Sequence, residues 1–122
     1  MPGQPRDDER EQRIVNEVIV DAYGPEEQAM GWYYYLEEAL AFPFIARCTT
    51  KRIISPTRVD EEVEVMGMAP EEECEREIFV RVQWQGHDLG IPLSQLEPVD
   101  AEGLTRQGVA DWRYWVARGY AF

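Results

Sequence analysis

The amino-acid sequence predicts an α+β domain in which two helices precede a small antiparallel sheet and a third helix follows it. Apolar residues recur with a helical period of about 3.6 up to the Phe42-Pro43 step, then with a period of about two, and from residue 105 with a helical period again. The length of 122 residues, with 44% hydrophobic content, is that of one domain.

The first helix is predicted to follow an N-terminal tail. Residues 1–7 contain two prolines and a glycine, and we assign 1–13 to a frayed tail that precedes a single domain over 14–122. The helix should end near Gly24, because glycine is common just past a helix end. Its apolar stripe consists of Ile14, Val15, Val18, Ile19 and Ala22.

The second helix is predicted between two prolines. Pro25 suits a first turn, and Phe42-Pro43 should end the helix. Because successive helical residues turn by about 100°, the three tyrosines at 33–35 cannot share one pocket, and at least one ring should be exposed or cap an edge. The core face consists of Ala29, Trp32, Tyr33, Leu36 and Leu40.

Short β-rich runs follow, and their valines alternate with polar residues, as is typical of antiparallel strands with one buried face. We therefore predict a small twisted antiparallel sheet, or SH3-like half-barrel. The runs are "FIARCTTKRII" (44–54), "EVEVMGM" (62–68), "EIFVRVQW" (77–84) and "LGIPL" (89–93). Residues 105–120 return to helical spacing, and one side of that helix carries Val109, Trp112, Trp115 and Val116.

The charge is strongly and regionally acidic. The chain has 24 acidic and 12 basic residues, a net charge of −12, which argues against nucleic-acid backbones and anionic membranes as partners. Residues 14–46 contain six acids and residues 59–75 contain eight, and neither tract contains Lys or Arg. Cations and basic proteins remain as partners.

Several carboxylates stand where a helix disfavours them. An acidic side chain stabilises a first turn and destabilises a last turn by about 0.3–1 kcal/mol. Glu26 and Glu27 fit a first turn, whereas Glu37 and Glu38 stand near a last turn, and Asp21 has the same place in the preceding helix. A bound cation would reverse that penalty.

The donor types indicate which cation. One His and two separated Cys give no imidazole or thiolate site, so the ligands must be oxygens, and calcium accepts about six to eight of them in loose geometry. No EF-hand loop is present. Glu27 and Glu38 are about 16 Å apart along their helix, so at least two carboxylate clusters are implied. The candidate ligands are Asp21, Glu26, Glu27, Glu37, Glu38, Glu71, Glu72, Glu73 and Glu75. The alternative for each residue is a solvated acidic surface.

Catalysis is not predicted. His87 and Asp88 are adjacent in "QGHD", but a single His beside a turn glycine is typical of a hairpin tip. Cys74 lies among acids that disfavour its thiolate. We expect Cys74 and Cys48 to be reduced and buried, since two cysteines make no disulfide framework.

A binding module is the second functional hypothesis. An acidic, SH3-like sheet with exposed aromatic residues would suit a basic protein partner. An excess of exposed tyrosine at Tyr34, Tyr35 or Tyr114 would raise the weight of this hypothesis.

Four ordered blocks resemble the CcbP-type calcium-binding proteins, first known from cyanobacteria. They are "DAYGPEEQAMGWYYYLEEALAFPF" (21–44), "VEVMGMAPEEECEREIFV" (63–80), "IPLSQLEPV" (91–99) and "DWRYWVARGY" (111–120). The resemblance implies a small, acidic, bacterial, non-enzymatic protein that binds calcium without an EF-hand. It departs at Glu38-Ala39, where an acidic residue followed by Asn is expected, and at Asp60, where a turn glycine is usual.

The remaining expectations concern setting and assembly. There is no charged-then-apolar leader and no apolar run of about 18 residues, so we expect a cytoplasmic protein that does not span a membrane. We expect a monomer whose partners are calcium ions, with a regulatory protein partner left open.

Overall fold

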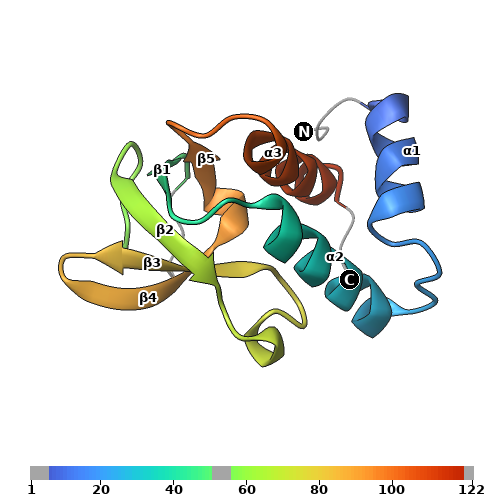
Figure 1. The fold of residues 1–122 in the computed structure, drawn as a ribbon, viewed down its shortest axis with the longest axis horizontal. Coiled ribbons are helices and arrows are strands. Elements are labelled where there is room, and N and C mark those ends of the chain that lie inside the picture. The colour runs from blue at the N-terminus through green and yellow to red at the C-terminus, as the bar shows by residue number, and fades with distance from the viewer. Residues whose placement is uncertain (1–5, 51–55, 120–122) are drawn as a thin grey trace.

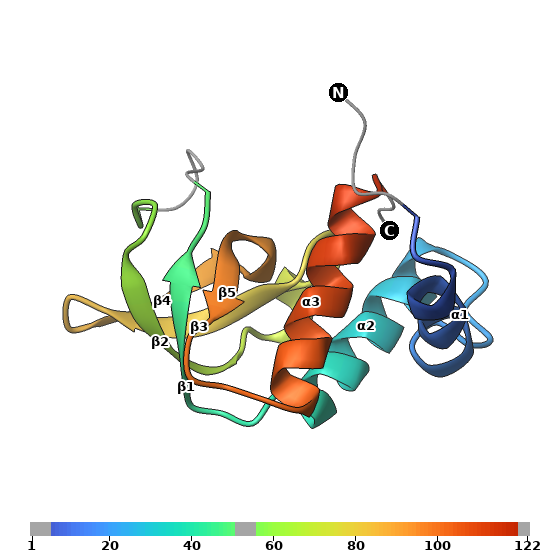
Figure 2. The ribbon, with the colours of Figure 1, turned by 90° about the horizontal axis from the view of Figure 1, so that it is seen from above.

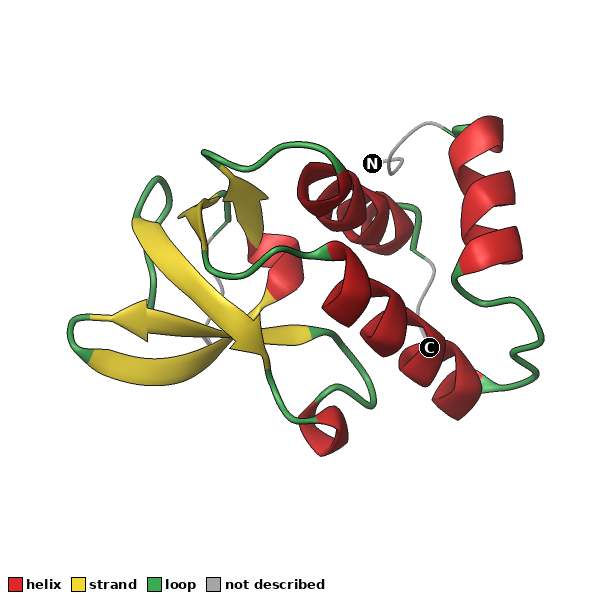
Figure 3. Cartoon of the chain, viewed as in Figure 1, coloured by secondary structure: helices red, strands yellow, loops and turns green. Residues whose placement is uncertain are grey.

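The computed structural model describes residues 6–50 and 56–119, and its elements follow the predicted α+β order (Figures 1 and 3). The described part of the chain contains helices α1 (Asp8–Glu17), α2 (Pro25–Ala39) and α3 (Leu104–Ala117), strands β1 (Phe44–Cys48), β2 (Glu62–Met68), β3 (Phe79–Trp84), β4 (His87–Pro92) and β5 (Leu96–Pro98), and the short 3-10 helices η1 (Glu71–Glu73) and η2 (Leu93–Gln95). The strands lie on one side of α2 and α3, and α1 lies on the other side (Figure 2).

The strands form one open antiparallel sheet in the order β4-β3-β2-β1-β5. β5 returns to pair with β1, with Pro98 opposite Ala46, so β4 and β5 remain the two edges. The predicted alternation is confirmed, since Val63 and Val65 are buried and Glu64 between them is exposed. The first predicted strand ends at Cys48, and residues 51–55 of that prediction lie outside the described residues.

The core lies between the sheet and the two central helices. Trp32 of α2 is fully buried, and its ring meets that of Trp112 of α3 edge to face at a centroid distance of 5.0 Å. Gly108 lets the helices approach, because a Cβ at this position would lie 3.3 Å from Leu40 Cδ2. Gly108 is therefore a packing residue of α3. Val116, predicted on the core side, is instead exposed.

The first helix is displaced from its predicted position. It begins at Asp8, because the Asp7 carboxylate accepts a hydrogen bond from the Arg10 backbone N–H at 3.0 Å and caps it. Residues 8–13, assigned to the tail from the sequence, thus lie in α1, while residues 1–5 are outside the described range. The predicted end near Gly24 is wrong, since α1 ends at Glu17.

Just after the end of α1, the chain comes into close contact with α2. The Val18 carbonyl oxygen lies 2.4 Å from where a Cβ of Gly31 would be, so only glycine admits this contact. Val18 is buried there, and the chain then turns through Asp21, whose φ is 61°. Of the predicted apolar stripe, Ile19 is half-buried against the core, whereas Val15 is 47% exposed.

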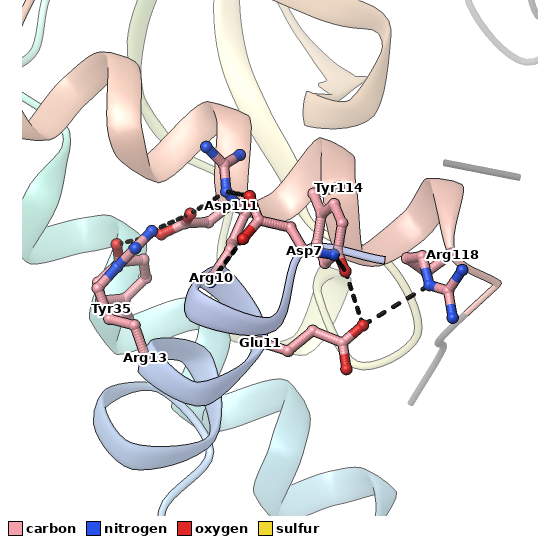
Figure 4. A network of polar contacts seen from close by, with 8 residues as sticks. All are labelled: Asp7, Arg10, Glu11, Arg13, Tyr35, Asp111, Tyr114 and Arg118. Atoms are coloured by element: carbon pink, nitrogen blue, oxygen red, sulfur yellow. Dashed lines mark hydrogen bonds and ion pairs between the residues drawn. The ribbon is translucent and has the colours of Figure 1, made fainter. Parts of the chain in front are cut away.

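A buried aspartate fastens α1 to the other two helices (Figure 4). Asp111 of α3 is fully buried and accepts hydrogen bonds from Arg13 of α1 and, at 2.8 Å, from the hydroxyl of Tyr35 of α2. Burial, followed by the bond to Asp111, raises the pKa of Tyr35. Nearby, the Tyr114 hydroxyl donates to Glu11 at 2.6 Å. These polar contacts supplement the small apolar contact of α1.

Candidate metal centre

All nine predicted carboxylates are exposed, and they fall in four segments of the structure. Asp21 lies in the loop between α1 and α2, Glu26 and Glu27 lie in the first turn of α2, Glu37 and Glu38 lie in its last turn, and Glu71, Glu72, Glu73 and Glu75 lie in η1 or just after it. α2 has acidic residues in its first turn and no basic residue in its last turn, as the sequence indicates.

Two consecutive tyrosines of α2 hold the loop that contains η1. The Tyr33 hydroxyl donates to the Ala69 carbonyl at 2.7 Å in a buried contact. The Tyr34 hydroxyl donates to Glu71 Oε1 at 2.8 Å at the surface. The two rings meet edge to face, with centroids 5.7 Å apart. The three tyrosines of α2 thus contact two parts of the fold, since Tyr35 instead reaches α3.

The same tyrosines place carboxylates from both elements in one region. Burial raises the pKa of Tyr33, and so do the negative charges of Glu37 on α2 and of Glu71 and Glu72 on η1. The pKa of Tyr34 is raised first by its hydrogen bond to Glu71. Glu37 and Glu38 follow Tyr34 by three and four residues, the spacing that places helical side chains on one face. We call the surface formed by Tyr34, Glu37, Glu38, Glu71 and Glu72 the acidic face.

The loop that contains η1 is anchored at its C-terminal end by Cys74. This thiol is buried, and the Phe79 backbone N–H donates to its Sγ at 3.4 Å. Burial raises the pKa of Cys74, so the side chain stays a neutral thiol. Cys48 and Cys74 are both free and buried, as predicted. Cys74 therefore serves to support the carboxylates of η1.

A second acidic group lies at the opposite end of α2. Glu26 and Glu75 line one hollow with Pro25 and Arg76. Arg76 brings a positive charge to this hollow, which opposes a cation there. Glu27 accepts a hydrogen bond from the Tyr23 backbone N–H at 3.0 Å and so closes the loop before α2.

Two other sequence features have structural roles. Asp60, which replaces the expected turn glycine, has φ 70°, the left-handed conformation that favours glycine. His87 is exposed beside the turn between β3 and β4, where Gly86 has φ 80°. This is the predicted hairpin tip.

Among the described residues, no helix is long and apolar enough to cross a bilayer.

The aromatic exposure that would favour a protein-binding module is limited. Tyr114 is buried and Tyr35 is half-buried, with its hydroxyl bonded to Asp111. Tyr34 is 50% exposed, as the helical turn requires of one ring in this run, but its hydroxyl is bound to Glu71. The structure thus gives this hypothesis no specific support.

The oxygen donors of the acidic face are of the type that calcium prefers. Their carboxylates are not close enough to one another to coordinate an ion together. The donors are carboxylate oxygens, which calcium prefers and which exclude a thiolate or imidazole site. Across residues 6–50 and 56–119, no group of three or more His, Cys, Asp or Glu side chains lies close enough to hold a metal ion. Binding therefore requires these exposed side chains to converge.

The comparisons with known proteins agree with this chemistry. A family model described as calcium binding, Calci_bind_CcbP, matches residues 12–116. The crystal structure of CcbP from Anabaena is 45% identical, with a TM-score of 0.87 and 100% of both chains covered. A calcium-binding protein in the calcium-binding form is also 45% identical, with a TM-score of 0.85 and 96% of both chains covered. A search of curated proteins finds no match. The chain belongs to the CcbP family of calcium-binding proteins.

Proposed function

We propose that the chain binds calcium through the acidic face. The observation that carries this proposal is the hydrogen bond from Tyr34 to Glu71, since it ties a carboxylate of η1 to a side chain one turn before Glu37 and Glu38 on α2. Membership of a calcium-binding family supports the choice of ion, as does the all-oxygen donor set.

The carboxylates of Glu37, Glu38, Glu71 and Glu72 would hold the ion, with water or backbone oxygens completing its coordination. When bound, calcium supplies the positive charge that offsets repulsion among these side chains. The C-terminal end of α2 adds to the attraction, because unpaired carbonyls give a helix end a partial negative charge and no basic residue offsets it here. η1 needs little movement, since Tyr33 and Cys74 anchor it on both sides.

The acidic face should take the first ion. The hollow lined by Glu26 and Glu75 also contains Arg76, whose charge weakens attraction for a cation. The acidic face has no comparable cation among its own members.

We expect calcium to stabilise the folded protein. A ligand that binds only the native state, at ten times its dissociation constant, adds about 1.4 kcal/mol to the free energy of unfolding. Thermal unfolding followed by circular dichroism, with calcium and then with excess chelator, measures this effect. Magnesium is the control, because its stricter octahedral geometry suits loosely placed carboxylates less well. A melting temperature that is the same with calcium and with chelator would refute calcium binding.

A further inference from the structure

Tyr34 is exposed enough to turn into solvent, yet its hydroxyl is directed at Glu71. Tyr34 is 50% exposed, and its ring meets the Tyr33 ring edge to face at a centroid distance of 5.7 Å. Tyr33 is itself fixed by burial and by the hydrogen bond to Ala69. A series of contacts therefore links the loop before η1 to Glu71. Ala69 accepts a hydrogen bond from Tyr33, the Tyr33 ring packs against the Tyr34 ring, and Tyr34 donates to Glu71.

This contact brings together charges that repel one another. Glu37 acts on both tyrosines electrostatically, so Glu71 is held on the side of α2 that already carries a carboxylate. An exposed glutamate without a partner would swing away, because like charges repel and its side chain gains rotamer freedom in solvent. The phenol hydrogen bond opposes both effects.

The contact also leaves Glu71 able to ligate. A carboxylate has about four acceptor positions on its two oxygens, and the Tyr34 hydroxyl occupies one on Oε1. Hydrogen bonds from a neighbouring residue to a ligating carboxylate orient it and raise metal affinity.

We propose that Tyr34 is a positioning residue for calcium, which acts by holding Glu71 on the acidic face before the ion arrives. This inference rests on the proposed function of that face. Tyr34 does not itself contact the ion, and its effect is lost when Glu71 is absent.

The test is a double-mutant cycle of calcium affinity by isothermal titration calorimetry. Tyr34→Phe keeps the ring and removes the hydroxyl, and it should weaken calcium binding about fivefold, since loss of such an orienting partner from a buried site typically costs about tenfold or more. In a Glu71→Ala background, Tyr34→Phe should have no further effect. Tyr23→Phe is the matched control, because Tyr23 is 86% exposed and lies outside the acidic face. It should leave the affinity unchanged.

A spectroscopic readout separates positioning from a general structural effect. In calcium-free protein, the ¹³C NMR shift of the Glu71 carboxylate should move in Tyr34→Phe and stay in place in Tyr23→Phe. Unchanged or tighter calcium binding by Tyr34→Phe would overturn the inference, as would an equal loss in both backgrounds. If Glu71→Ala alone binds calcium normally, the proposed site fails at Glu71 and the inference fails with it. If Glu71→Ala binds weakly but Tyr34→Phe binds normally, only the inference fails.

Discussion

Replacing Asp111 with alanine is expected to lower the free energy of unfolding by about 2–4 kcal/mol, because it leaves the Tyr35 hydroxyl and the half-buried Arg13 guanidinium without their buried acceptor. Asp111 is fully buried and bonded to Arg13 and Tyr35, and Arg10 Nε lies 3.6 Å from its Oδ1. The variant keeps the arginines and the tyrosine hydroxyl but removes their acceptor. Urea unfolding at neutral pH, followed by circular dichroism, measures the change.

The control for Asp111→Ala is Asp8→Ala, which removes an aspartate from an ion pair at the surface. Asp8 lies 2.7 Å from Arg6 Nε, but both side chains are mostly exposed, and such pairs contribute about 0–1 kcal/mol. Asp8→Ala should therefore change stability far less than Asp111→Ala. Equal losses in the two variants would show that Asp111 does not fasten α1 as described.

Neutralising Glu37 and Glu38 together, as Glu37→Gln with Glu38→Gln, should weaken calcium binding about a hundredfold, or about 2.8 kcal/mol. Each substitution removes one charge and one strong oxygen ligand from the acidic face. The calcium-free protein should become more stable, because two negative charges leave the last turn of α2. Calorimetry with calcium and urea unfolding with chelator measure these opposite effects.

Glu26→Gln with Glu27→Gln is the matched pair at the other end of the same helix. These charges favour the first turn of α2, and Glu27 also accepts the hydrogen bond from the Tyr23 backbone. Their loss should destabilise the calcium-free protein, a change of opposite sign. If the Glu37 and Glu38 variant gains stability without losing calcium affinity, these carboxylates are only a solvated surface.

The sheet and the two central helices were predictable from local signals. Pro25 and the Phe42-Pro43 step bracket α2, which runs from Pro25 to Ala39, and the valine alternation marks β2 and β3. The end of α1 was not predictable, because apolar spacing continues after Glu17 while the backbone turns. Just after that end, the Val18 carbonyl packs against Gly31 of α2, a tertiary contact that no local signal indicates.

The candidate ligands were predictable as exposed carboxylates, but their grouping was not. Glu71 meets Tyr34 across 37 positions of sequence, and nothing local to either residue indicates that contact. Asp111 was missed as a buried charge, because its partner Arg13 lies 98 positions away and an aspartate in a helix normally faces solvent. The spacing of the tyrosine run indicated a core helix. It did not indicate that the three hydroxyls form hydrogen bonds to the loop containing η1 and to α3.

The most direct test of the account is the position of calcium in a crystal of the calcium-loaded protein, located by anomalous scattering. We expect an ion on the acidic face, coordinated by at least one carboxylate from the last turn of α2 and at least one from η1. An ion bound elsewhere, with none of Glu37, Glu38, Glu71 and Glu72 among its ligands, would contradict it.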